Sequence, residues 1–247
     1  MANSMAKDYW PLALKEIELS KNYVHVWSIR LDQTSETTSK LRQILSLEER
    51  SRADKFYFEH DRNRFTVARA ILRTILGNCL GQNPSEIEFS YAKNGKPFLV
   101  NTDLRFNLSH SKDLALCAIT YQRELGVDIE YLRLMKDAEQ IAARFFSPRE
   151  SSLFCSLSQA EKQLAFFRCW TRKEAYIKAI GDGLSYGLDK FDVTFTQNEP
   201  VKLLRVLSNP KEVERWSLKE LEPAEDFIGA VIVEGNDWEL CSWQYLI

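Results

Sequence analysis

A strand of alternating apolar and acidic residues, followed later by a helical Glu–Lys pair, constrains this chain more than any other feature. Residues 125–130 read Leu-Gly-Val-Asp-Ile-Glu, a pattern typical of a β-strand whose Asp128 and Glu130 side chains leave the same face. Glu174 and Lys178 lie four residues apart in a helical pattern, so they also share a face. If this strand and this helix pack together, three carboxylates and a lysine converge.

Such a convergence would create a site for a hard cation. Carboxylates supply the oxygen ligands that Mg²⁺ prefers, and a nearby lysine could bind a phosphate that the cation also holds. Two plainer interpretations stay open, because alternating acids are common on exposed strands and Glu–Lys pairs at this spacing stabilise ordinary helices. The residues therefore indicate magnesium-assisted chemistry on a phosphate ester as one of the alternatives.

The composition is that of a globular protein without a dominant charge. The 247 residues are 45% hydrophobic and 28% charged, and the net charge is −2, so no general basic field favours nucleic acid or a membrane surface. A basic run between residues 50 and 73 is typical of a solvated helix face. No apolar run has the length of a membrane span, and residues 1–10 lack the apolar core of a signal peptide. Five scattered cysteines without metal or redox spacing favour a reducing cytoplasm.

The order of elements predicts an α+β chain with two similar halves. Ser46 and Ser147 each open a capping-box pattern, and the helical regions that follow end at Gly77 and Gly181. This echo places a boundary near 121–126, giving halves 1–123 and 124–247, with the acidic strand close to the seam, where ligand sites are common. Strand patterns lie at 23–31, 87–91, 114–120, 125–130, 191–196, 216–220, 227–233 and 239–245, and helical patterns after 46–49 and at 61–76, 137–146 and 158–180.

Residues 106–111, Phe-Asn-Leu-Ser-His-Ser, form a second candidate site. A Ser–His hydrolase would need an acid that orients the base and a G-x-S-x-G elbow for the nucleophile, and the chain has no such elbow. A turn in which hydroxyls, backbone N–H groups and the His110 imidazole bind a phosphate fits better. The chain also lacks a P-loop and a G-x-G-x-x-G motif, which argues against ATPase, kinase and dehydrogenase chemistry.

Taken together and in this order, the motifs resemble those of the surfactin-type (Sfp-like) 4′-phosphopantetheinyl transferases. The resemblance rests mainly on Gly126-Val-Asp-Ile-Glu130 with Trp170-Thr-Arg-Lys-Glu-Ala175, and the second motif is similar to the W/KEA subgroup. The matching segments span residues 46 to about 190 and further include Ser46–Arg52 with Phe56-Tyr57, Arg64 to Leu72-Arg73, Asn94–Pro97, Phe106–Ser111, Arg144–Ser147 with Glu150, and Lys178.

This resemblance implies transfer of the phosphopantetheine arm of coenzyme A to a serine of an apo acyl or peptidyl carrier protein, with release of adenosine 3′,5′-bisphosphate. It implies a monomer of two α/β halves related by a pseudo-two-fold axis, with coenzyme A in the cleft between them. Asp128, Glu130 and Glu174 would hold Mg²⁺ at the pyrophosphate. Lys178 would bind the pyrophosphate and stabilise the leaving group. Glu150 would act as general base for the carrier serine, directly or through a metal-bound water.

The same resemblance implies a set of coenzyme A contacts. Ser109 and His110 match a phosphate-contacting turn, and Lys96-Pro97 matches the strip near the adenine. Arg52 matches a basic residue at the 3′-phosphate. The full set of expected binding residues is Arg52, Arg64, Lys96, Pro97, Ser109, His110, Lys173 and Lys178.

Two positions depart from the pattern expected for the 3′-phosphate pocket. Glu49 stands where the best-known member of the family has a basic residue, and Phe65 stands where it has a hydroxyl residue. We therefore expect Arg64 or Arg69 to compensate at this pocket. The carboxylate triad shows no departure.

Two other functions remain open from the sequence. A metal-dependent phosphoesterase or pyrophosphatase acting on coenzyme A or a nucleotide would use the same carboxylates, with water in place of the serine. A non-catalytic module could bind carrier proteins without turnover, although the joint presence of Asp128, Glu130, Glu174 and Lys178 argues against it. Because carrier proteins present an acidic helix beside the target serine, we expect a small docking surface that is partly basic or apolar.

Overall fold

The computed structural model of this chain describes residues 10–13 and 17–247. Its strands are β1 (Tyr23–Arg30), β2 (Ser90–Tyr91), β3 (Pro97–Phe98), β4 (Leu104–Ser111), β5 (Leu114–Tyr121), β6 (Leu125–Tyr131), β7 (Phe191–Val193), β8 (Leu203–Val206), β9 (Trp216–Leu221), β10 (Phe227–Glu234) and β11 (Glu239–Tyr245). Its α-helices are α1 (Ser35–Arg42), α2 (Leu47–Asp54), α3 (Glu59–Leu80), α4 (Ala138–Phe145), α5 (Pro148–Ser156), α6 (Gln159–Ile180) and α7 (Glu212–Arg215). Short 3₁₀ turns lie at Pro84–Glu86, Leu184–Tyr186 and Leu188–Lys190.

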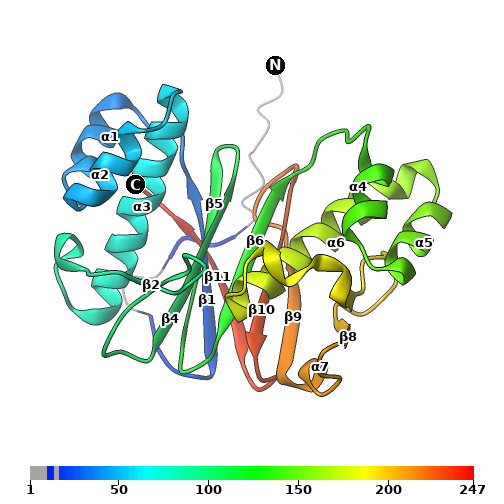
Figure 1. Cartoon of the computed structure of the whole chain (residues 1–247). Helices are drawn as coiled ribbons and strands as arrows, with labels where there is room; N and C mark the ends of the chain where they lie inside the picture. The colour runs from blue at the N-terminus through cyan, green and yellow to red at the C-terminus, as the bar shows by residue number, and fades with distance from the viewer. Residues whose placement is uncertain (1–9, 14–16) are drawn as a thin grey trace.

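The strands form two main sheets that stand side by side, each covered by its own helices (Figure 1). The first sheet has the order β11-β1-β5-β4, and the second has the order β6-β10-β9. Helix α3 buries Val67 and Ile71 against Trp27 and Phe106 of the first sheet. Helix α6 packs Phe167 and Ile177 into the core of the second half with residues of β10. Strands β4 and β6 face each other at the seam, and they belong to different sheets.

Each half repeats the same local sequence of helices, as the internal echo predicts. Ser46 and Ser147 accept a hydrogen bond from the backbone N–H three residues on, and the Glu49 and Glu150 carboxylates accept one from the backbone N–H of the capping serine. A helix of 22 residues follows in each half, α3 in the first and α6 in the second. The mixed α/β architecture with two similar halves is therefore confirmed.

The predicted end of the first long helix at Gly77 is wrong. Helix α3 continues to Leu80 and stops at Gly81, which has a left-handed φ of 64°. Gly77 lies inside the helix, where a Cβ atom would come within 2.8 Å of the Gln82 carbonyl oxygen. Because Gly77 has no side chain, the chain that follows the helix can fold back against it. The helix itself ends at Gly81, in the left-handed conformation.

Strand β11 crosses back from the second half to the first sheet. It pairs in parallel with β1, from Tyr23 opposite Glu239 to Ile29 opposite Tyr245. Trp243 Nε1 donates to His25 Nδ1 at 3.2 Å, which adds a side-chain hydrogen bond between the two strands. The expected second half, 124–247, thus contains the whole second sheet but also a strand of the first.

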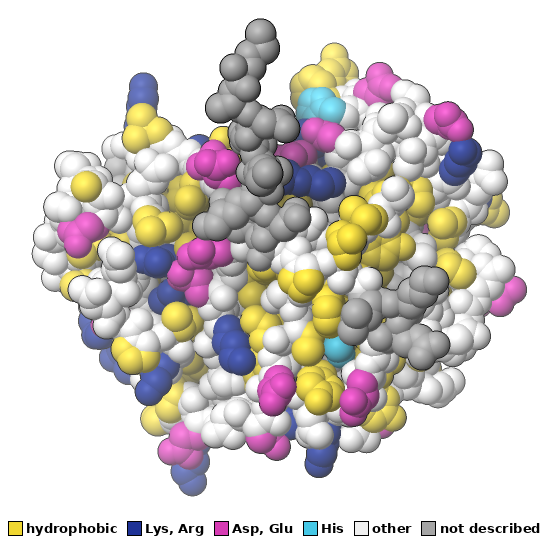
Figure 2. Space-filling model, turned by 180° about the vertical axis from the view of Figure 1, so that it is seen from behind, with side chains coloured by type: hydrophobic (Ala, Val, Ile, Leu, Met, Phe, Trp, Pro, Cys, Tyr) yellow, Lys and Arg dark blue, Asp and Glu magenta, His cyan; other side chains and the backbone are white. Residues whose placement is uncertain are grey.

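The opposite side of the molecule is shown in Figure 2. On this side, lysine and arginine side chains are interspersed with acidic ones, in line with the small net charge of −2. Within the described ranges, no helix has the length and apolar character needed to cross a membrane.

Gly126 sets the distance between β6 and α6, the two elements that carry the acidic residues. A Cβ atom at this position would lie 2.1 Å from the Ala175 carbonyl oxygen and 2.5 Å from the Ala179 nitrogen. Both atoms belong to the backbone of α6, so they cannot move aside as a flexible side chain could. Strand and helix therefore touch backbone to backbone, two residues before Asp128.

We expect Gly126→Ala to push α6 away from β6 and to lower the free energy of unfolding by about 1–3 kcal/mol or more, the usual cost of overpacking. Urea unfolding followed by circular dichroism would measure the loss. A variant as stable as the natural protein would contradict the close approach.

Candidate functional site

The three predicted carboxylates come together where α6 crosses β6. Asp128 is buried, whereas Glu130 and Glu174 are half-buried. Burial and the negative charges of Asp128 and Glu130 raise the pKa of Glu174 to about 7, and the Lys178 ammonium opposes the rise. The strand period and the helix spacing bring Asp128, Glu130 and Glu174 close enough to interact electrostatically.

Lys178 connects this cluster to the first half of the molecule. Its Nζ donates to Asp128 Oδ1 at 2.6 Å and to Ser109 Oγ at 2.7 Å. Ser109 Oγ in turn donates to Asp128 Oδ1 at 2.8 Å. A strand of the first sheet, a strand of the second sheet and helix α6 thus meet at one carboxylate oxygen.

The chemistry of the cluster fits a hard divalent cation. The second oxygen of the buried Asp128 carboxylate, Oδ2, has no hydrogen-bond partner, although buried polar atoms are normally paired. Burial, with a smaller contribution from the Asp128 and Glu130 charges, raises the pKa of Glu174, and Lys178 offsets only part of the rise. In the part of the chain that the structure describes, no three acidic, histidine or cysteine side chains are already arranged around one metal position. The donors fit Mg²⁺ by type and charge, and Lys178 partly neutralises them in this arrangement.

His110 follows Ser109 on β4 and lies at the edge of the same cluster. Desolvation, followed by the positive charge of Lys178, lowers the pKa of His110, and Arg64 on α3 lowers it further. The ring is therefore neutral near pH 7, with Lys178 and Arg64 on the one hand and Asp61 and Asp128 on the other as its charged neighbours. Arg64 itself is held by Asp32, with distances of 2.7 and 3.0 Å to its two carboxylate oxygens. These positions could receive an anion next to the carboxylates.

The structure explains why Glu49 stands where the family pattern has a basic residue. Glu49 is buried and accepts from the guanidinium groups of both Arg69 and Arg73. Arg69 is therefore committed to Glu49, which does not support its expected compensating role. Arg52 remains exposed, with its guanidinium 5.4 Å from the centre of the Phe65 ring. Both residues line a hollow of about 210 Å³ beside Arg69.

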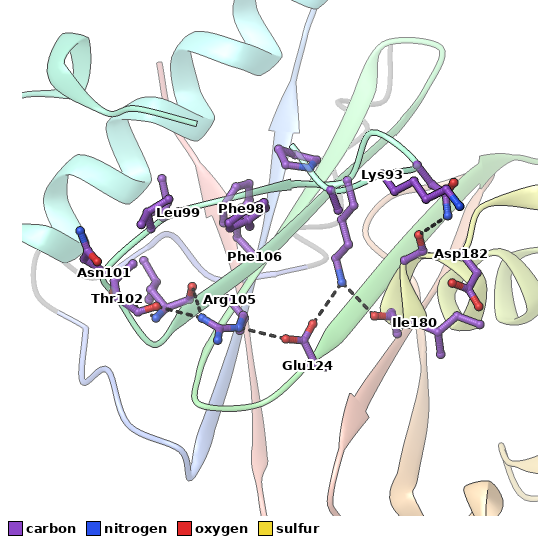
Figure 3. A pocket seen from close by; sticks show the side chains of 18 residues that line it. Lys93, Phe98, Leu99, Asn101, Thr102, Arg105, Phe106, Glu124, Ile180 and Asp182 are labelled. Atoms are coloured by element: carbon purple, nitrogen blue, oxygen red, sulfur yellow. Dashed lines mark hydrogen bonds and ion pairs between the residues drawn. The ribbon is translucent and has the colours of Figure 1, made fainter. Parts of the chain in front are cut away.

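The Lys96 side chain faces away from the carboxylate cluster. Its Nζ donates to Ala179 O at 2.9 Å, Leu125 O at 3.2 Å and Glu124 Oε2 at 3.3 Å. Burial lowers the pKa of Lys96. This side chain lines a cavity of about 660 Å³, and Figure 3 shows Glu124 and Arg105 among the other residues in the wall; none of the three carboxylates lines it. The ammonium of Lys96 therefore joins the two halves, and only the surrounding hairpin is free to contact a ligand.

Glu150 and Lys173 form a closed ion pair in the core of the second half. Their charged atoms are 2.6 Å apart, and both side chains are 0% exposed. Glu150 also accepts from the backbone nitrogens of Ser147 at 3.0 Å and Val193 at 2.7 Å. We therefore correct two expectations: without opening the core, no substrate atom can reach the carboxylate of Glu150 or the ammonium of Lys173, so neither fits as a general base or a coenzyme A contact.

Residues 106–111, expected to form a phosphate-binding turn, belong to strand β4 instead, and the sequence analysis did not predict their contacts with β6. Ser111 Oγ donates to Glu130 Oε2 at 2.9 Å, and Asn107 Oδ1 accepts from the Val127 backbone nitrogen at 2.9 Å. With Ser109, they occupy every second position of β4, which puts them on one face. The alternation of polar residues in the sequence could have predicted that these side chains share a face.

We expect Glu174→Gln to stabilise the metal-free protein at pH 8 by about 1–2 kcal/mol, a value reduced for partial solvent screening. The folded pKa of Glu174 is raised to about 7, so its negative charge costs stability above the unfolded pKa. The advantage of the variant should be absent below about pH 4, grow up to pH 7 and then level off. Unfolding in urea between pH 4 and 8, with EDTA, measures it. A variant less stable than the natural protein at pH 8 would show that the negative charge of Glu174 does not destabilise the metal-free protein.

We expect Glu150→Gln to lower the free energy of unfolding by about 3–5 kcal/mol, because it leaves the Lys173 ammonium buried without a counter-charge. Replacing both residues by methionine should recover most of the loss. Urea unfolding of the single and double variants makes the comparison. A fully stable single variant would reopen a chemical role for Glu150.

Comparisons with known proteins agree with this geometry. The family profile described as "4′-phosphopantetheinyl transferase, N-terminal" matches residues 30–122, and that of the "4′-phosphopantetheinyl transferase superfamily" matches residues 124–232. The chain is 43% identical to the 4′-phosphopantetheinyl transferase HetI of Nostoc sp., over 98% of this chain and 100% of that protein. It is 31% identical to the 4′-phosphopantetheinyl transferase Sfp of Bacillus subtilis, over 72% of this chain and 80% of that protein. It is also 31% identical to a phosphopantetheinyl transferase of Thraustochytrium sp., over 73% and 69% of the two chains. The chain belongs to the 4′-phosphopantetheinyl transferase superfamily.

Proposed function

We propose that this chain transfers the 4′-phosphopantetheine of coenzyme A to a serine of an apo acyl or peptidyl carrier protein. The observation that supports this most is the meeting of Asp128, Glu130, Glu174 and Lys178 at the seam between the two halves. Relatives named as 4′-phosphopantetheinyl transferases align over most of the chain. A site at the seam also agrees with the preference of ligand sites for clefts between structural units.

Asp128, Glu130 and Glu174 would hold Mg²⁺. Their donors are all oxygens, and the buried Asp128 Oδ2 is left without a partner. When bound, the ion neutralises negative charge on the pyrophosphate of coenzyme A. Lys178 would then exchange part of its contact with Asp128 for a phosphate oxygen.

Lys178 is the residue that would stabilise the leaving group. In the transfer, the serine oxygen forms a bond to the phosphorus that carries pantetheine, and the bond from that phosphorus to the bridging oxygen of adenosine 3′,5′-bisphosphate breaks. The departing oxygen gains negative charge, which a lysine fixed in place can stabilise or protonate. Ser109 and Asp128 hold the Lys178 ammonium at the cluster before substrate arrives. Because Glu150 is buried, the serine proton would pass to solvent water as the new bond forms.

The first half would supply the remaining contacts to coenzyme A. His110, neutral and next to Lys178, could donate to a phosphate oxygen, and Ser109 lies beside it. Arg52, at the hollow with Phe65, is placed to contact a further phosphate. The hairpin at Lys96-Pro97 would contact the adenine through its backbone and Pro97, since the Lys96 ammonium is engaged elsewhere.

The partner would be an apo carrier protein that docks transiently beside this seam. The chain would act as a monomer, since its second half completes the site that a partner subunit would otherwise supply. Hydrolysis of coenzyme A by the same carboxylates and carrier binding without turnover are the competing outcomes.

Incubation of an apo acyl carrier protein with this protein, coenzyme A and Mg²⁺ should raise the carrier's intact mass by one phosphopantetheine. EDTA should prevent the increase, and Lys178→Met should lower kcat about 100-fold, the usual cost of removing one preorganised donor. The control is Lys202→Met, which changes an exposed lysine next to β8. Adenosine 3′,5′-bisphosphate released with the carrier unmodified would indicate hydrolysis. Acyl and peptidyl carriers both unmodified, with coenzyme A intact, would refute the transfer.

A further inference from the structure

Three polar side chains on β4 form hydrogen bonds to β6 and so connect the two sheets. Asn107, Ser109 and Ser111 occupy alternate positions of the strand and each contacts β6. Asn107 accepts from the Val127 backbone, Ser109 donates to Asp128, and Ser111 donates to Glu130. Because the two strands share no backbone ladder, these side chains fix how β4 and β6 lie against each other.

Ser109 and Ser111 make the same kind of hydrogen bond, each to a different carboxylate. Each donates to one oxygen of one carboxylate: Ser109 to Asp128 Oδ1 at 2.8 Å and Ser111 to Glu130 Oε2 at 2.9 Å. The other Asp128 oxygen has no partner. Among the described residues, the hydrogen bonds and ion pairs of Glu130 all go to Oε2, from Ser111 and from Arg133 at 3.3 Å, and leave Oε1 open.

The direction of the Ser111 hydroxyl is determined by its other contact. The Tyr131 backbone N–H donates to Ser111 Oγ at 3.1 Å, so the single hydroxyl proton is available for Glu130. Ser111 is half-buried, and it is bonded to one carboxylate alone. Ser109 also receives Lys178, so its substitution would disturb two functions at once. Ser111 therefore offers the cleaner test.

We propose that Ser111 is a positioning residue that holds the Glu130 carboxylate with one oxygen turned to the metal. This inference rests on the proposed function. Without the hydroxyl, the remaining donor to Glu130 is Arg133, whose side chain is 48% exposed and also donates to the Tyr131 carbonyl oxygen, so it holds the carboxylate less firmly. Groups that orient metal ligands from behind usually change metal affinity by 10- to 100-fold when removed.

The test compares Ser111→Ala, Ser111→Thr and Ser28→Ala with the natural protein. Threonine keeps the hydroxyl and suits a strand. Ser28 is a buried serine of the same sheet whose hydroxyl donates to the Trp243 carbonyl oxygen, so its removal controls for the loss of a buried hydroxyl. Titration with Mn²⁺ alone, with free Mn²⁺ followed by electron paramagnetic resonance, gives the dissociation constant without any turnover.

Ser111→Ala should weaken Mn²⁺ binding about tenfold, and Ser111→Thr and Ser28→Ala should leave it within about twofold of the natural value. In the transfer assay, the Mg²⁺ concentration for half-maximal rate should rise by about the same factor, with kcat at saturating Mg²⁺ retained. Unchanged Mn²⁺ affinity in Ser111→Ala would overturn the inference. So would an equal loss in Ser28→Ala, because the effect would then be one of general stability.

The two proposals fail in different ways. A natural protein that binds Mn²⁺ with the expected loss in Ser111→Ala, yet modifies no carrier, would refute the transferase function and support the role of Ser111. A natural protein that modifies carriers, with Mn²⁺ affinity equal in Ser111→Ala, would support the function and overturn that role.

Discussion

The backbone contact between β6 and α6 at Gly126 is the constraint on which the site depends. No Cβ separates the strand from the Ala175 and Ala179 backbone atoms, so the helix lies as close to the sheet as two backbones allow. One strand then contributes two carboxylates and the helix a third, together with Lys178. A helix held further away by ordinary side chains would separate Glu174 from Asp128, whose charge, after burial, is the next largest cause of the raised pKa of Glu174.

The second constraint is that the two sheets meet through side chains. A continuous backbone ladder between β4 and β6 would occupy the edge of each strand with N–H···O bonds. Here Asn107, Ser109 and Ser111 join the two strands through their side chains. Lys96 connects the halves at the other end of the seam, because it donates to backbone carbonyls of both β6 and α6. Side chains, and not a shared ladder, therefore hold the two halves together on both sides of the acidic cluster.

Local periodicity explains how much the sequence could predict. The period of two in residues 125–130 and the spacing of four between Glu174 and Lys178 determine which side chains share a face, and both survive in the structure. The capping boxes at Ser46 and Ser147 are equally local. The positions of Glu150, Lys173 and Lys96 were not predictable in this way, because whether a charged group is buried depends on elements distant in sequence. Gly77 shows the same limit, since its role is set by the returning chain and not by the helix itself.

Burial alone does not separate structural charges from chemical ones in this protein; the charged groups around each one do. Glu150 and Lys173 are fully buried, and each is bonded both to the other and to backbone groups, as a stable buried pair requires. Glu49 is likewise matched by two arginines. Asp128 is nearly as buried, yet one of its oxygens is unpaired beside two further acids. Asp192 is also buried with one oxygen unpaired, and its other oxygen pairs with Arg205 at 2.8 Å. What distinguishes Asp128 is that two further acids, Glu130 and Glu174, interact with the same cluster. The grouping of three acids, more than the unpaired oxygen itself, is therefore what supports the proposed cation site.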